Sequence, residues 1–147
     1  MPLNTSLIGR EYPALSLAVE RDHVDRFAQS IGEDGAVFRD PEAARAAGYP
    51  EQLAPPTFVT TLQIMASAVV AADQELGLDY TRVLHGEQEY EWRRPVHVGD
   101  ELTATPRIAD ISGRGPLEFL IVESEIKDAA GETVVVARTT LLCRGAP

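Results

Sequence analysis

The stretch TFVTTLQIMASAVVAADQELG, residues 57–77, organises the whole chain. Wound as a helix it is rich in alanine and apolar on nearly every side, and Gly77 supplies a residue type that commonly ends helices. A helix without a polar face is expected to be buried. Since Pro55 and Pro56 precede it, we predict one long buried helix from Thr57 to Leu76.

The residues after this helix follow a different pattern. Apolar and polar side chains alternate along stretches rich in β-branched and aromatic residues, and turn sequences at 98–100, 113–116 and 128–131 separate them. Four consecutive strands with short connections are expected to pair as an antiparallel meander. The predicted strands are HGEQEYEWRRPV (85–96), ELTATPRIADI (101–111), LEFLIVESEIKD (117–128) and TVVVARTTLLCR (133–144).

Before the long helix, residues 15–19 predict a short strand. Residues 20–33 predict an amphipathic helix that ends at Gly32, with His23 on its solvated side. Asp40-Pro41-Glu42 predicts a capped helix start. This order of elements predicts an α+β fold in one domain over residues 1–147, with an antiparallel sheet wrapped around the central helix.

The net charge limits which classes of molecule this chain is expected to bind. The net charge of −10 and the pI of about 4.7 make nucleic acid and anionic membranes poor partners. Arg93, Arg94 and Arg107 are candidates for a local basic patch that could still receive an anionic small ligand, although surface arginines more often serve solubility.

The cysteine and histidine content argues against disulfides and metals. Cys143 is alone, which fits a reducing cytoplasm, and it lies in an apolar run that favours a buried thiol. His23, His85 and His97 are scattered, so we expect no metal and no cofactor. The N-terminus does not have the pattern of a signal peptide, and the stretch 58–72 is too short to span a membrane.

Four segments in this order resemble a known family. They are IGREYP (8–13), VDRFAQSIGE (24–33), DPEAARAAGYPEQLAPPTF (40–58) and VLHGEQEYEWRRPVHVGDEL (83–102). Together they are similar to the hot-dog fold of MaoC-like hydratases and dehydratases. The best match is the N-terminal, FAS1-type dehydratase branch, which includes the HadA- and HadC-type subunits of (3R)-hydroxyacyl-ACP dehydratase.

The resemblance also shows what is missing. Active members of this superfamily carry Asp and His in a loop resembling G-D-x-N-P-x-H-x-D, and these side chains hold a water and move a proton at the substrate α-carbon. A backbone N–H from a Gly at the start of the central helix polarises the thioester carbonyl. Here the Asp position holds Glu33, the His position holds Phe38 and the Gly position holds Pro56, which has no N–H.

The resemblance therefore implies a division of labour. A chain of this branch shapes the acyl-chain tunnel, and a MaoC-like partner supplies the Asp/His dyad and the amide donor. The implied ligand is an acyl-CoA or acyl-ACP thioester. We expect a dimer, either of two identical chains or with the MaoC-like partner, because a lone sheet of this kind leaves an edge strand uncovered.

Six residues are candidates for direct roles. Glu33 and His85 are candidate catalytic residues, as substitutes for the missing dyad, although a lone histidine at a strand start is more often structural. Backbone N–H groups at Thr57 or Phe58 could bind a carbonyl, or simply cap the helix. Arg93 and Arg94 could contact the phosphates of coenzyme A or of phosphopantetheine, or pair with surface acids.

Three functions remain open at this level. The first is a subunit of an (R)-specific enoyl-CoA hydratase or (3R)-hydroxyacyl-ACP (or CoA) dehydratase. The second is a self-sufficient hydratase or hot-dog thioesterase that uses Glu33 with His85. The third is a non-enzymatic module that binds acyl thioesters.

Overall fold

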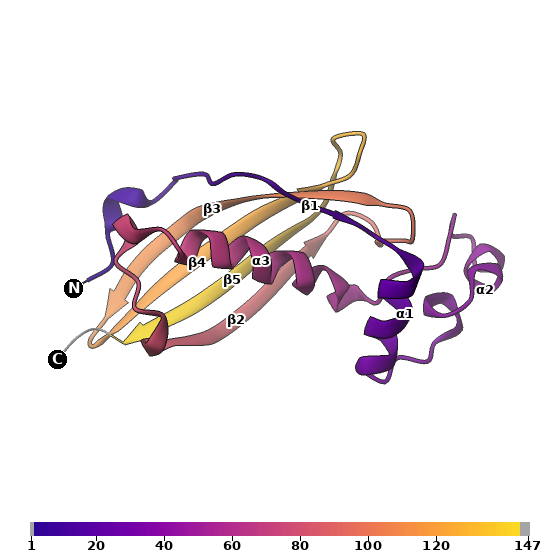
Figure 1. The fold of residues 1–147 in the computed structure, drawn as a ribbon, viewed down its shortest axis with the longest axis horizontal. Helices are drawn as coiled ribbons and strands as arrows, with labels where there is room; N and C mark the ends of the chain where they lie inside the picture. Colours follow the sequence, from indigo (N-terminus) through magenta and orange to yellow (C-terminus); the bar gives the residue numbers. More distant parts are fainter. Residues whose placement is uncertain (1, 145–147) are drawn as a thin grey trace.

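A curled, five-stranded antiparallel sheet wraps around one helix in the computed structural model, which describes residues 2–144 (Figure 1). The helix is α3 (Thr60–Ala71), and the strands follow the order β1-β3-β4-β5-β2 across the sheet. This arrangement confirms the predicted fold. The strands are β1 (Leu15–Ala18), β2 (Val83–Trp92), β3 (Glu101–Arg114), β4 (Leu117–Lys127) and β5 (Thr133–Arg144).

Strand pairing confirms three members of the predicted meander and corrects the fourth. β3, β4 and β5 pair consecutively, but β2 pairs with β5 at the far edge of the sheet and not with β3. The reason is that β4 takes one edge of β3 and β1 takes the other, with Leu15 opposite Ala104. Closeness in sequence therefore could not predict the partner of β2. This strand pairs with β5, whose outer edge was free.

The central helix is shorter than predicted. A 3-10 turn, η3 (Pro56–Val59), precedes α3, and a second one, η4 (Gln74–Leu76), follows it. Asp73 caps η4 by accepting a hydrogen bond from the N–H of Glu75, and Gly77 ends that turn with a positive φ of 75°. The predicted helix is thus three segments, η3, α3 and η4. The last one is separate because Asp73 caps its own turn.

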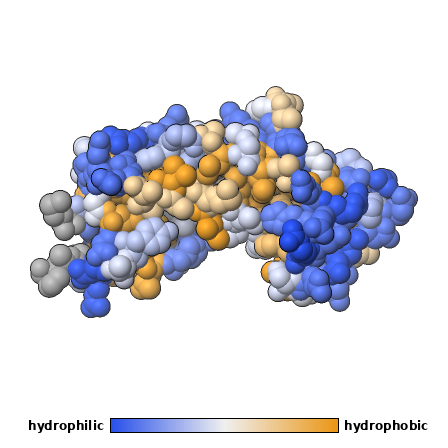
Figure 2. All heavy atoms as spheres, viewed as in Figure 1, coloured by the Kyte–Doolittle hydropathy of each residue, from blue (hydrophilic) through white to orange (hydrophobic). Residues whose placement is uncertain are grey.

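The sheet buries only one side of α3. Leu62, Ala66 and Val70 are fully buried against it, whereas Ile64 is 64% exposed and Met65 is 44% exposed. The expectation of burial on nearly every side is therefore wrong for the chain alone. Figure 2 shows an apolar band along the middle of this view, over α3 and its surroundings.

The remaining helical segments are shorter. α1 (Arg21–Ser30), η2 (Ala36–Phe38) and α2 (Pro41–Ala46) follow β1, and α1 and α2 lie beyond one end of the sheet (Figure 1). Two 3-10 turns, η1 (Thr5–Leu7) and η5 (Tyr80–Arg82), complete the elements. Within residues 2–144 no helix is both long enough and apolar enough to cross a membrane.

Two local predictions can be compared with these helices. Asp40 caps α2 through a 2.9 Å hydrogen bond from the N–H of Glu42, as predicted. The placement of His23 on the solvated side of α1 is wrong. Its ring lies edge-on to the ring of Phe58, with 4.8 Å between centroids, so the histidine covers part of the core.

Candidate functional site

A cavity of about 430 Å³ opens where the central helix begins, and we call it the entry cavity. It brings together Phe38 and Pro56, the two residues at the positions that the family resemblance assigns to His and Gly. A phenyl ring cannot transfer a proton, and proline has no N–H to donate. The lining residues are Phe38, Tyr49, Leu53, Ala54, Pro56, Trp92, Arg93, Arg94, Pro95 and Val96.

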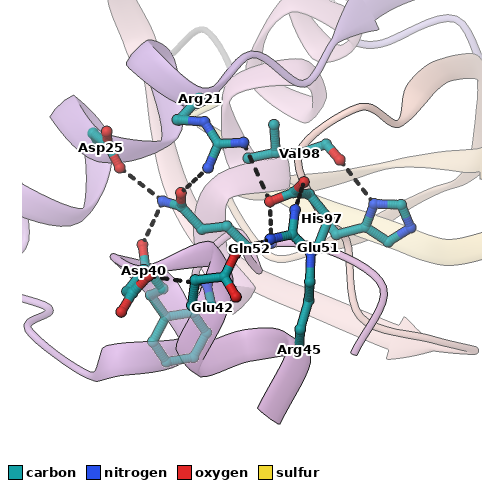
Figure 3. A network of polar contacts seen from close by, with 10 residues as sticks. Arg21, Asp25, Asp40, Glu42, Arg45, Glu51, Gln52, His97 and Val98 are labelled. Carbon is teal, nitrogen blue, oxygen red and sulfur yellow. Dashed lines mark hydrogen bonds and ion pairs between the residues drawn. The ribbon is translucent and has the colours of Figure 1, made fainter. Parts of the chain in front are cut away.

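A buried glutamine holds the loop that carries Phe38 (Figure 3). Gln52 is fully buried, and its Nε2 donates to Asp25 Oδ1 at 2.7 Å and to the Phe38 carbonyl at 2.9 Å. Its Oε1 accepts from Arg21 Nη1 at 2.9 Å. All of its polar atoms are therefore paired, which fixes the loop against α1.

Sequence reasoning missed Gln52. The only available signal was its position as a polar residue beside the apolar run that starts at Leu53. Its neighbour Glu51 extends the network by pairing with Arg21 and Arg45. The N–H of Gln52, followed by the guanidinium of Arg21, lowers the pKa of Glu51 below its usual value.

A larger cavity of about 830 Å³ lies between α3 and strand β2, and we call it the helix–strand cavity. Most of its exposed wall is apolar, which suits a hydrocarbon ligand. Its lining residues are Thr57, Thr60, Ile64, Ser67, Tyr80, Val83, His85, Gln88, Tyr90, Thr139 and Leu141.

A chain of hydrogen bonds runs from the core along this cavity to its rim. Gln63 Nε2 donates to Thr139 Oγ1 at 3.0 Å, and Thr139 Oγ1 donates to Gln88 Oε1 at 2.9 Å. Gln88 Oε1 also lies 3.2 Å from His85 Nε2. Nearby, the hydroxyls of Thr60 and Tyr90 pair with each other, and burial raises the pKa of Tyr90.

The two candidate catalytic side chains lie at different places. His85 lines the helix–strand cavity from β2, with its side chain exposed at the rim. Glu33 lies in the loop after α1, where its Oε1 accepts a 2.8 Å hydrogen bond from the N–H of Gly35. The lining of neither cavity includes Glu33. Within the described chain the structure therefore does not bring them together as a pair.

The candidate donors at the helix start also differ from one another. The N–H of Phe58 is taken by the Pro55 carbonyl at 2.8 Å. Phe58 itself is fully buried, while Thr57 is exposed and lines the helix–strand cavity. Of the two, Thr57 is the residue placed to meet a ligand.

The candidate phosphate-binding arginines are held by carboxylates. Arg94 pairs with both oxygens of Asp100 at 2.9 Å and with Asp128 at 3.1 Å, and these contacts raise its pKa and lower that of Asp128. Arg93 is more exposed and pairs with Glu91 at 2.9 Å. Both arginines line the entry cavity, but Arg94 is engaged in holding the turn before β3.

The third arginine of the expected basic patch lies elsewhere. Arg107 is on β3 and pairs with Glu123 at 2.6 Å, and the entry cavity does not include it. The structure thus separates Arg107 from Arg93 and Arg94. Among the described residues there is also no cluster of three or more His, Cys, Asp or Glu side chains able to hold a metal ion.

Comparison with solved structures supports the fold. The chain is 30% identical to a chain of the HadBC (3R-hydroxyacyl-ACP dehydratase) complex from Mycobacterium tuberculosis, with a TM-score of 0.78, covering 92% of this chain and 96% of that one. A MaoC-like dehydratase gives a TM-score of 0.88 at 25% identity, over 96% of this chain and 43% of the other. An (R)-hydratase from A. caviae, 18% identical over 95% of this chain and 96% of the other with a TM-score of 0.71, shares the fold.

Sequence comparison gives the family. A UPF0336 protein of Saccharopolyspora erythraea is 45% identical over 146 residues, which cover 99% of this chain and 94% of the relative. A second UPF0336 protein, from Streptomyces coelicolor, is 42% identical over 99% of this chain and 98% of the relative. The family described as FAS1-like, dehydratase domain region, matches residues 6–137. The chain therefore belongs to the FAS1-like dehydratase domain region family.

Proposed function

We propose that this chain is the acyl-binding subunit of an (R)-specific enoyl-CoA hydratase or a (3R)-hydroxyacyl-ACP (or CoA) dehydratase. The observation that carries the proposal is the entry cavity, where Phe38 and Pro56 stand together in the wall. Neither residue can move a proton or donate a hydrogen bond to a thioester carbonyl. The cavity can therefore receive a substrate without supplying the usual catalytic groups.

The second support is the helix–strand cavity beside it. Its volume of about 830 Å³ and its largely apolar wall suit the hydrocarbon part of an acyl thioester. Pro56 lines the entry cavity and Thr57, the next residue, lines the helix–strand cavity. A thioester bound at the start of α3 could thus extend its acyl chain along the helix.

The chemistry is assigned to a MaoC-like partner. In this reaction the elements of water add across the double bond, with the oxygen at the β-carbon and the proton at the α-carbon, or leave in the reverse direction. The partner's Asp and His would handle water and proton. The HadBC relative is itself a complex, which supports a two-subunit arrangement for this chain. A reducing cytoplasm, as the lone cysteine suggests, is the proposed compartment.

The test is hydration of a series of enoyl-CoA esters by the purified chain alone and then with a MaoC-like partner added. We expect no turnover by the chain alone, turnover with the partner, and a chain-length preference that changes when residues of the helix–strand cavity are substituted. A control uses the same partner with its catalytic His replaced. Turnover by this chain alone would contradict the proposal.

His85 carries a second candidate, a self-sufficient hydratase or thioesterase. It lines the helix–strand cavity and lies within hydrogen-bond distance of Gln88, so it is placed to meet a ligand. Glu33 shares no cavity with it, which weakens the pair as a catalytic unit. If the chain alone turns over substrate, His85→Ala should abolish the activity, and intact activity would exclude His85. Binding without turnover under every pairing would instead identify a non-enzymatic acyl-thioester module.

A further inference from the structure

One hydroxyl group in the wall of the helix–strand cavity has no hydrogen-bond partner. Ser67, on α3, is 8% exposed and lines the cavity, and its Oγ is buried and unpaired among the described residues. Rotation about the Cα–Cβ bond to another staggered rotamer would turn this hydroxyl toward a ligand. Burying a hydroxyl without a partner is unfavourable, and such groups are rare in folded proteins. A serine at this place is therefore explained best by a partner that arrives with a ligand.

Three neighbouring hydroxyls in the cavity wall already have partners. Gln63 Oε1 is also unpaired, but Gln63 is fully buried and does not line the cavity. Thr139 Oγ1 both accepts a hydrogen bond from Gln63 and donates one to Gln88, at 3.0 Å and 2.9 Å. The hydroxyls of Thr60 and Tyr90 are paired with each other. These groups already satisfy one another in the wall, so a polar ligand atom in this part of the cavity would find its partner in Ser67.

The surrounding wall fits a hydrocarbon chain. Ile64 and Val83 line the same cavity, together with Leu141 of β5. An unsubstituted acyl chain would fill this space but leave Ser67 unpaired. A chain with a hydroxyl or oxo group at the right depth would fill the space and pair the serine as well.

Helix geometry places that oxygen far from the thioester. Ser67 lies two turns beyond Thr60, which is about 10 Å along the axis of an α-helix. Each carbon–carbon bond spans at most about 1.5 Å, so about seven or more bonds separate the two levels. With the thioester at the start of α3, as the proposed function requires, the oxygen lies well beyond the β-carbon where water is added.

We infer that this chain binds acyl thioesters that carry a hydroxyl or oxo group remote from the thioester, and that Ser67 recognises this oxygen. The inference rests on the proposed function and deepens it by naming the substrate class. Ser67 is then a specificity-determining residue and takes no part in the chemistry.

The test measures binding of the full chain to acyl-CoA esters of one length, either unsubstituted or carrying a single hydroxyl or oxo group at successive carbons. We expect the wild-type chain to bind one remote-oxygen isomer about five- to tenfold more tightly than the unsubstituted ester, which is the gain from one hydrogen bond. Ser67→Ala should remove this preference while binding of the unsubstituted ester persists. Ser67→Thr, which keeps a hydroxyl, should retain the preferred isomer.

Ser124 provides a matched control. Its Oγ is also buried and unpaired, but Ser124 lies on β4 and does not line the cavity, so Ser124→Ala should leave the preference unchanged. Equal binding of all isomers, or a preference that survives Ser67→Ala, would overturn the inference and leave the proposed function intact. Failure of every acyl thioester to bind would count against both. If sedimentation showed that Ser67→Ala alters self-association while no ester binds, the cavity would belong to an interface with a second copy.

Discussion

At the scale of single residues, Arg94 is the clearest case of a side chain whose partners define its role. Asp100 is 7% exposed and receives both arms of the guanidinium. Removing Arg94 would leave this carboxylate buried without its counter-charge. The arginine expected to bind phosphates therefore acts first as a structural residue between the turn before β3 and Asp128.

We predict that Arg94→Ala lowers the free energy of unfolding by about 2–3 kcal/mol, less than for a fully buried pair because the Arg94 side chain is 33% exposed. Arg94→Lys should recover part of the loss, since lysine keeps the charge but lacks the planar fork. Urea denaturation measures both. Arg93→Ala is the control and should cost less than about 0.5 kcal/mol, because Arg93 and Glu91 are both about half exposed. If Arg94→Ala instead weakened CoA binding and left stability unchanged, Arg94 would be a ligand-binding residue and not a structural one.

Cys143 offers a second test at this scale. Burial, followed by the negative charge of Glu118, raises the pKa of its thiol to about 11. The native thiol should therefore react slowly with a disulfide reagent near pH 8 and quickly after unfolding. Between the ordinary thiol pKa and about 11, the unfolded state loses its proton first, so stability contributed by the neutral thiol should fall as pH rises through this window. Labelling followed by mass spectrometry, with and without denaturant, checks the reactivity, and Cys143→Ala should remove this part of the pH dependence.

At the scale of elements, the start of β2 depends on a glycine. The register between β2 and β5 shifts between His85 and Glu87, at Gly86. A Cβ added at Gly86 would lie 1.9 Å from Leu142 Cδ1 and 3.2 Å from the Thr140 carbonyl. Glycine therefore fits here without displacing the Leu142 side chain or crowding the Thr140 carbonyl.

We predict that Gly86→Ala destabilises the chain by about 1–3 kcal/mol, because Leu142 or the strand has to move to make room. Thermal or urea unfolding measures the loss. Gly113→Ala is the control. A Cβ there would lie 3.9 Å from the Leu117 carbonyl of β4, an ordinary contact distance, so this substitution should be nearly neutral. Unchanged stability of Gly86→Ala would mean that β2 can slide along β5 without cost.

At the scale of the whole molecule, several large apolar side chains remain exposed. Ile64 and Met65 lie on the uncovered face of α3, and Leu84 on the edge strand β2 is 70% exposed. An edge strand with apolar side chains invites pairing with another chain. The fold therefore leaves exposed apolar side chains on α3 and on the β2 edge that a second subunit could cover.

We predict that the chain associates in solution and that Leu84→Lys weakens this association at least tenfold without lowering the stability of the fold, because the charge falls on an exposed edge. Sedimentation over a range of concentrations measures the effect. Ile8→Lys, a change at another exposed apolar residue, is the control and should leave association unchanged. If the wild-type chain stayed monomeric at every concentration, self-association would be excluded, and these side chains would be left for a different partner to cover.

The amino-acid sequence was sufficient for the features that depend on local order. Periodicity predicted the strands and the central helix, and capping residues predicted α2. These inferences succeed because hydrogen-bonding capacity and backbone preference belong to the residue itself or to its near neighbours. That Phe38 and Pro56 replace the usual His and Gly is what the family resemblance implies, and it stays a prediction.

Long-range packing accounts for the rest. The partner of β2, the exposed face of α3, the burial of Gln52, the pairing of Arg94 with Asp100 and the unpaired hydroxyl of Ser67 emerged from the folded chain. Each of these depends on contacts between segments far apart in the sequence or on how far the sheet covers the helix. Periodicity does not predict which strand edge stays free or which buried polar group finds a partner. Both depend on contacts between distant segments, which form only when the whole chain packs around its core.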